Sequence, residues 1–251
     1  MTSEVILEAV NLRKNFGGLA AVDGVDLTLR AGAITGIIGP NGSGKTTLLN
    51  LLAGLIKPDT GRVYLQGQDI TELSAHERYR MGLARSFQQA SLFKMSVLDN
   101  LLVADRASTG ESILAPFRNW GRQEKEAALR CLALAEQVDL QSKLKSPSQE
   151  LSGGQLKLLE TARAMEKGSK VILLDEPVAG ILPDLAHRIL DTFRKSVKEQ
   201  KLASAIVEHR LEILLKYCDN VCAMDRGKII AQGSPEEIRQ NKLVVESYLG
   251  A

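Results

Sequence analysis

The residues best suited to chemistry begin with the stretch GPNGSGKT, residues 39–46. It matches the pattern G-x-x-x-x-G-K-[ST] in full, which is typical of a loop that surrounds phosphate groups. Glycines allow backbone N–H groups to turn toward phosphate oxygens where side chains would clash. Lys45 would reach the β- and γ-phosphates, the hydroxyl of Thr46 would hold Mg²⁺, and a helix beginning at Gly44 would direct its positive end at the same charge.

A second group of polar residues follows apolar stretches that read as buried strands. Asp175 and Glu176 follow the apolar residues of VILLDEP, and His209 ends SAIVEH. Asp175 fits a carboxylate that binds Mg²⁺ directly or through water, and Glu176 fits a general base for attack of water on a γ-phosphate. His209 lies where open α/β sheets bind ligands, so it fits a residue that orients or senses the γ-phosphate. Taken alone, an Asp-Glu pair is often a cap and a histidine an ordinary core or surface residue. The upstream phosphate loop favours the functional interpretation.

The stretch LSGGQ, residues 151–155, holds no acid, base, thiol or metal ligand. It nevertheless precedes a predicted helix, so its serine and glycines form a second group of donors suited to phosphate. Phe16 precedes a turn and is either a core residue or an aromatic ring that stacks on a purine. Gln88 taken alone indicates only a polar loop.

These residues need strands that place them and helices that cover the strands. Alternating patterns predict two strands within residues 5–30, and AITGIIG predicts a buried strand before the phosphate loop. Residues 99–138 read as mostly helical, apart from a loop-rich insertion over 107–121. Helices then alternate with strands to the end of the chain. The fold class is therefore α/β, a mostly parallel sheet flanked by helices, with an N-terminal antiparallel β lobe and a helical subdomain.

The composition is that of an ordinary soluble globular protein. The chain has 251 residues, 44% hydrophobic and 25% charged, with a net charge of +2, which gives no argument for nucleic-acid binding. Three scattered cysteines have no metal-ligand spacing and fit a reducing compartment. The N-terminus is unlike a secretory signal, and no stretch approaches the roughly 18 apolar residues that span a bilayer. We therefore expect a cytoplasmic protein that meets a membrane only through a partner.

Taken in order, these motifs resemble those of the ATP-binding subunit of an ABC transporter over nearly the whole chain. The resemblance implies one domain, 1–251, with the fold of a P-loop NTPase. Its RecA-like core and antiparallel β lobe would comprise 1–88 and 166–251, and the helical subdomain that carries the signature motif would comprise 89–165. Gln88 would be the Q-loop residue, 151–155 the signature and 171–175 the Walker B strand.

The resemblance also implies the ligands, ATP and Mg²⁺, and the residues that serve them. The catalytic residues would be Glu176, His209 and Gln88, and the metal residues Thr46, Gln88 and Asp175. The nucleotide-binding residues would be Phe16, Gly39, Pro40, Asn41, Gly42, Ser43, Gly44, Lys45, Thr46, Thr47, Ser152, Gly153, Gly154 and Gln155. Two subunits would pair head to tail, each ATP lying between one phosphate loop and the other subunit's signature.

The expected partners are a second ATPase subunit, identical or different, transmembrane permease subunits and a solute-binding protein, at the cytoplasmic face of the inner membrane. No nucleic acid is expected. Several stretches, among them GLARSFQQASLF and AIVEHRLEIL, are most similar to the branched-chain amino-acid importer branch. Alternatives are import of urea or short amides, export of lipopolysaccharide, or a slow cassette that acts mainly by dimerising on ATP. A soluble ABC ATPase of DNA repair or translation would carry coiled-coil insertions or two fused cassettes, and this chain has neither.

One position departs from the pattern of the family. The loop after DEP usually ends in Asp, or in Asn within the branched-chain group, and Leu182 occupies that position here. A leucine side chain neither donates nor accepts a hydrogen bond. The departure bears on turnover and on coupling between the two sites, and not on ATP binding.

Overall fold

A computed structural model describes residues 4–86, 93–104, 120–165 and 168–249. Gln88 and nearly all of the predicted insertion 107–121 lie outside these ranges. The chain divides into two compact units, the first made of residues 1–85, 170–177 and 194–251, and the second of residues 86–169 and 178–193. The predicted core included 178–193, which instead groups with the helical unit. Each unit is described by itself below.

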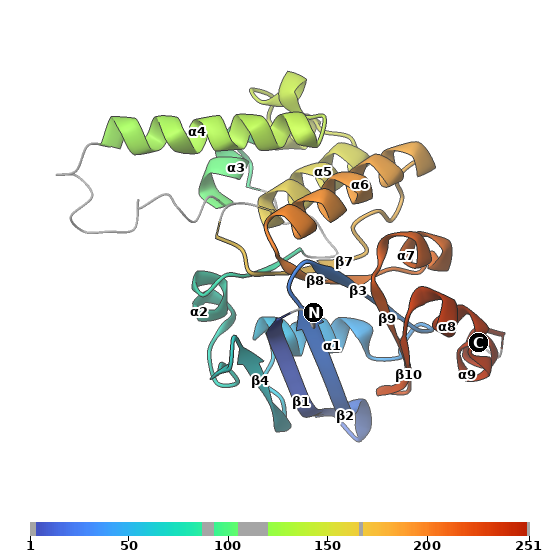
Figure 1. The fold of residues 1–251 in the computed structure, drawn as a ribbon. Helices are drawn as coiled ribbons and strands as arrows, with labels where there is room; N and C mark the ends of the chain where they lie inside the picture. Colours follow the sequence, from blue (N-terminus) through green and yellow to red (C-terminus); the bar gives the residue numbers. More distant parts are fainter. Residues whose placement is uncertain (1–3, 87–92, 105–119, 166–167, 250–251) are drawn as a thin grey trace. The chain divides into compact units, whose positions relative to one another are not determined.

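The first unit contains two sheets, and both confirm the predicted fold class. Figure 1 shows the antiparallel sheet in blue to teal. Its strand order is β2-β1-β4-β5, with β2 Leu19–Arg30, β1 Val5–Phe16, β4 Thr60–Leu65 and β5 Gln68–Asp69. The second sheet has the order β10-β9-β3-β8-β7-β6, with β10 Lys228–Gly233, β9 Asn220–Asp225, β3 Ala33–Ile38, β8 Ala203–Val207, β7 Val171–Asp175 and β6 Leu83–Arg85. All neighbours in this sheet are parallel except β10 and β9.

The central strands are apolar because the sheet is covered on both faces. β7 and β8 are buried at every position, which is the pattern of parallel strands. Their side chains join those of β1, β2 and α1 (Lys45–Ala53) in one core. The other helices of this unit are α2 Ala75–Arg80, α7 Leu211–Tyr217, α8 Pro235–Gln240 and α9 Lys242–Leu249.

A buried arginine fixes the far end of α1. Arg78, on α2, donates to the carbonyl oxygens of Leu51 and Leu52 at 2.8 Å and to that of Thr71 at 2.7 Å. The last carbonyls of a helix have no partner within the helix, so a cation is favourable there. Burial lowers the pKa of Arg78 to about 10. This contact fixes the carboxyl-terminal end of α1, whose amino-terminal end follows the phosphate loop.

The second unit is helical, as predicted. It contains α3 Val97–Ala104, α4 Trp120–Gln137, α5 Gly153–Ala164 and the first part of α6 Pro183–Glu199, which continues into the first unit. Asn100 is fully buried, and its amide donates to the carbonyl oxygens of Phe93 and Ser96, both at 3.0 Å. The residues just after the undescribed segment 87–92 are thereby attached to α3. None of the helices formed by the described residues combines the length and the apolar character that crossing a membrane would require.

Candidate functional site

The phosphate loop joins β3 to α1 and is closely packed against its neighbours. A Cβ atom on Gly39 would lie 2.2 Å from the carbonyl oxygen of Met224, and one on Gly44 would lie 2.2 Å from that of Ala21. Both glycines also have a positive φ, 152° and 103°. Only glycine satisfies both conditions at these positions. The sequence pattern is therefore required by the local packing as well as by a ligand.

Lys45 begins α1 and turns back over the loop. Its Nζ donates to the carbonyl oxygens of Gly39 at 2.8 Å and Pro40 at 2.9 Å. Burial lowers the pKa of Lys45, and the negative charges of Glu176 and Asp175 oppose that shift. The cation is thus kept within the loop beside two carboxylates. The Oγ of Ser43, in the same loop, is buried without a hydrogen-bond partner among the described residues, so the loop has an unused polar group that fits a phosphate ligand.

Asp175 and Thr46, both predicted to hold Mg²⁺, lie near each other. Asp175 ends β7 and is 1% exposed, and the Thr46 hydroxyl at the start of α1 lies close enough to its carboxylate to influence its pKa. Burial raises the pKa of Asp175, while the neighbouring Arg85 and the Thr46 hydrogen bond lower it. Among the described residues, no group of three His, Cys, Asp or Glu side chains could hold a metal ion. One carboxylate and one hydroxyl instead fit Mg²⁺, which usually keeps waters and takes phosphate oxygens as further ligands.

Glu176 and His209 form a second pair at the same edge of the sheet. Oε1 of Glu176 lies 2.7 Å from Nε2 of His209, and the backbone N–H of Glu176 donates to the carbonyl oxygen of Val207 at 2.9 Å. Glu176 has a positive φ of 51°, a conformation that non-glycine residues rarely adopt and that recurs at functional sites. The side chain is only partly buried, so a water molecule can reach its carboxylate.

The signature residues 151–155 span the start of α5, which begins at Gly153 with Ser152 as its N-cap, within the signature and not after it as the sequence pattern predicted. The Ser152 hydroxyl accepts from the backbone N–H of Gln155 at 3.3 Å, and Oε1 of Gln155 accepts from that of Ser152 at 2.9 Å. This reciprocal cap fixes where the helix begins. A Cβ atom on Gly153 would meet nothing within 4 Å, and one on Gly154 only Leu185 at 3.5 Å. The helix start is therefore an open surface on which backbone groups are accessible.

The structure also describes the remaining predicted residues, apart from Gln88. Phe16 ends β1 and is 49% exposed, which excludes the core interpretation, and Nζ of Lys14 lies 5.7 Å from its ring centroid. Leu182 is 77% exposed. In the loop, Asn41 and Gly42 are exposed and Pro40 is partly buried, and Thr47 follows within α1. Gln88 lies outside the described residues.

Sequence reasoning missed Arg85, which contacts the predicted metal residue. Its Nη2 lies 3.2 Å from Oδ2 of Asp175, and its Nη1 donates to Oδ1 of Asn50. The residue lies in LARSFQ, which the sequence analysis used only as a mark of the branch. A basic residue that ends a short strand would have been a signal only if that strand were known to lie beside β7.

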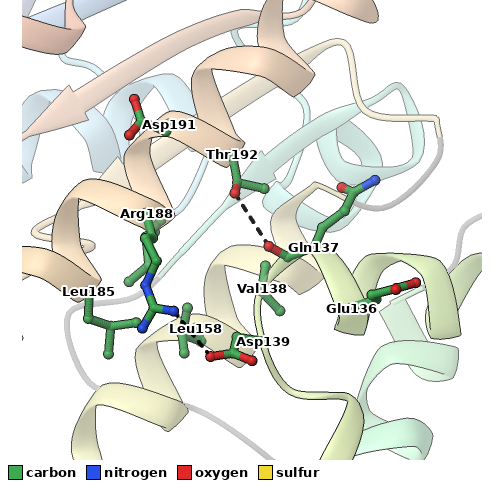
Figure 2. Close-up of a pocket in the computed structure, with 10 residues that line it drawn as sticks. Glu136, Gln137, Val138, Asp139, Leu158, Leu185, Arg188, Asp191 and Thr192 are labelled. Atoms are coloured by element: carbon green, nitrogen blue, oxygen red, sulfur yellow. Dashed lines mark hydrogen bonds and ion pairs between the residues drawn. The ribbon is translucent and has the colours of Figure 1, made fainter.

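A pocket of about 390 Å³ lies in the second unit, between the end of α4, α5 and the start of α6. Figure 2 shows the Arg188 guanidinium near the Asp139 carboxylate, 3.5 Å apart, and the Thr192 hydroxyl near the Gln137 carbonyl oxygen, 3.3 Å apart. Leu158 and Leu185 supply apolar surface. No predicted site residue lines this pocket, and the phosphate loop, Asp175 and Glu176 belong to the first unit.

A phosphate loop between β3 and α1, with acids at the end of a parallel strand, defines a P-loop nucleotide-binding protein. The chain matches the family described as ABC transporter over residues 22–179 and the family described as branched-chain amino acid ATP-binding cassette transporter over residues 228–251. The chain therefore belongs to the ABC transporter family, as one of its ATP-binding subunits. Cassettes of this family hydrolyse ATP to power transport.

Individual relatives extend the match over the full length. A probable branched-chain amino acid transport ATP-binding protein LivG of Archaeoglobus fulgidus is 44% identical, over 98% of this chain and 96% of that protein. The high-affinity branched-chain amino acid transport ATP-binding protein BraF of Pseudomonas aeruginosa is 35% identical over 99% of each chain. The crystal structure of an ABC transporter cassette in its ADP conformation has a TM-score of 0.84 and 39% identity, over 99% of this chain and 100% of that one.

Proposed function

We propose that this chain binds Mg-ATP and hydrolyses it to drive the import of branched-chain amino acids through membrane partner subunits. The observation that carries the ATPase assignment is the buried carboxylate of Asp175, which ends β7 near Thr46 of the phosphate loop, with Glu176 next in the chain. The relatives named as branched-chain amino acid transport proteins support the choice of solute.

Each residue has a role that its position allows. Lys45 moves from the loop carbonyls to the β- and γ-phosphates, a short rotation for a flexible side chain. Thr46, Asp175 and Gln88 hold Mg²⁺, which when bound neutralises charge on the phosphate oxygens. Phe16 stacks on the purine ring.

Glu176 accepts the proton of the attacking water, and His209 positions the Glu176 carboxylate through the 2.7 Å contact. The open start of α5 supplies N–H donors to the ATP bound by a second subunit. ATP then holds two subunits together, and its hydrolysis releases them. The subunits work at the cytoplasmic face of the inner membrane, where permease subunits and a solute-binding protein complete the system.

The test of the transported solute is an uptake measurement in a cell that lacks this gene. Uptake of labelled leucine should fall and should return with the wild-type gene, but not with Glu176→Gln expressed at the same level. Labelled urea in the same cells serves as the competing solute. Unchanged leucine uptake together with a fall in urea uptake would contradict the assignment and favour the amide branch.

A further inference from the structure

Arg85 occupies a place in the site to which the proposed mechanism gives no role. It ends β6, the edge strand of the parallel sheet, and pairs in register with Leu173 of β7. Two residues further along β7 is Asp175, and Nη2 of Arg85 lies 3.2 Å from its Oδ2. The side chain of Arg85 is 6% exposed, so the pair is shielded from water.

The guanidinium also reaches the helix of the phosphate loop. Its Nη1 donates to Oδ1 of Asn50, which lies on α1 one turn beyond Thr46. The planar fork of an arginine can make two directed contacts at once, which a lysine ammonium cannot reproduce. One side chain therefore ties the helix that carries Thr46 to the strand that carries Asp175.

The energetics of this pair favour a functional reason for its presence. The side chains of Arg85 and Asp175 are 6% and 1% exposed, so both charged groups have lost the solvation that they would have at the surface. A buried ion pair contributes little net stability compared with well-packed apolar residues. A role in stability alone would therefore be a weak explanation for a charge in this position.

We infer that Arg85 is a positioning residue for Mg²⁺-dependent nucleotide binding. Through its contact with Asn50, it holds Oδ2 of Asp175 in place near the Thr46 hydroxyl, so that these two side chains can receive the metal. This inference rests on the proposed function, because it needs Thr46 and Asp175 to be the metal residues. It adds a residue that touches neither nucleotide nor metal and acts through Asp175.

The test measures the affinity of a fluorescent ADP for purified protein, once with Mg²⁺ and once with EDTA. Arg85→Gln should weaken binding about tenfold with Mg²⁺ and less than twofold with EDTA. In an Asp175→Asn background the same substitution should change either affinity less than twofold, since the group it acts through is gone. Melting temperatures of all variants are measured without nucleotide to separate stability from binding.

Arg62→Gln is the matched control, because it breaks an exposed Arg–Asp pair of 2.7 Å elsewhere in the same unit and should change neither affinity. If Arg85→Gln does not fold, Arg85→Lys and Asn50→Ala carry the test. The first keeps the charge and the second keeps the arginine, and each removes the bridge. Each should weaken only the Mg²⁺-dependent binding, by threefold or more.

Two results would overturn the role of Arg85. One is an equal loss with Mg²⁺ and with EDTA, which indicates a structural role. The other is a loss that persists undiminished in the Asp175→Asn background. A wild-type protein that binds ADP without any response to Mg²⁺ would instead refute the metal site of the proposed function, and this inference with it. If Mg²⁺ changes the ADP affinity of the wild type and Arg85→Gln has the same affinities as the wild type, this inference alone would be refuted.

Discussion

Leu182 places an apolar side chain where the family pattern predicts a hydrogen-bonding one. It is 77% exposed just before α6, and its carbonyl oxygen accepts from the N–H of Ala186 at 2.9 Å. The backbone thus has a structural role, while the side chain is directed to solvent. The effect of the departure should therefore fall on catalysis in the paired state and not on folding.

We predict that Leu182→Asn leaves the melting temperature unchanged and raises the ATPase rate or leaves it unchanged. Asparagine restores a donor and an acceptor where two subunits would face each other. Steady-state hydrolysis of purified wild type and variant checks this, with Leu243→Asn, another exposed leucine, as the control. A large loss of activity in Leu182→Asn would contradict our interpretation of the position.

The sequence was sufficient to predict site residues that directly follow a recognisable strand. It was not sufficient to predict a residue that lies in the site only because its strand pairs with a strand distant in sequence. Asp175 and Glu176 were identified because they follow an apolar strand downstream of a phosphate loop. Arg85 was not, since β6 is only three residues long and nothing in the sequence says that it pairs with β7. Non-local strand pairing is the part of the fold that local patterns cannot give.

At the scale of elements, the phosphate loop depends on close approach to its neighbours. We predict that Gly39→Ala lowers the melting temperature and weakens ADP binding at least tenfold, because its Cβ would lie 2.2 Å from a backbone oxygen and 2.6 Å from Oγ of Ser43. Gly67→Ala is the control, with a positive φ of 78° but open space around its Cβ. It should lower stability by about 1–2 kcal/mol, the ordinary cost of a left-handed backbone for a non-glycine residue, and leave ADP binding unchanged. Equal binding losses in both variants would contradict this account.

Asp59, the residue just before β4, has a carboxylate whose effect on stability depends on pH. Asp59 accepts from Nζ of Lys14 and from the N–H of Asn15, both at 2.7 Å, and these contacts lower its pKa, the Lys14 bond most. Since the pKa is lower in the folded state, the stabilisation is present above the ordinary value of about 4 and is lost as pH falls through the lowered value. The melting temperature of Asp59→Asn should therefore be lower than that of the wild type at pH 7, and the difference between the two melting temperatures should become smaller toward pH 3. A difference in melting temperature that stays constant between pH 7 and pH 3 would contradict this prediction.

At the scale of the whole molecule, each compact unit is made of segments that are separated along the sequence. Residues 178–193, which follow the acids of β7, group with the helical unit, although the predicted boundary placed them in the core. In that unit Leu185, on α6, packs 3.5 Å from the position of a Cβ on Gly154. The loop of Leu182 and the signature are thus parts of one compact unit, a link that helix and strand patterns alone could not provide.

A head-to-tail dimer predicts a specific effect of charge at the signature. Gly153→Asp adds a carboxylate where a Cβ meets nothing within 4 Å, so the fold should be kept. We expect the variant, combined with Glu176→Gln, to bind ATP as the single variant does but to remain a monomer by light scattering. The Glu176→Gln protein alone should double its mass on adding ATP. A doubled mass in both proteins would show that the signature does not face a partner's phosphates.

The central claim, that Glu176 activates water for ATP hydrolysis, is tested most directly by the release of phosphate from Mg-ATP. The wild type should turn over, and Glu176→Gln should be slower by a factor of 100 or more with ATP affinity changed less than threefold, because glutamine keeps the shape of the side chain and cannot accept the proton. Glu212→Gln, on the exposed side of α7, should behave as wild type. Equal rates for wild type and Glu176→Gln would contradict the account.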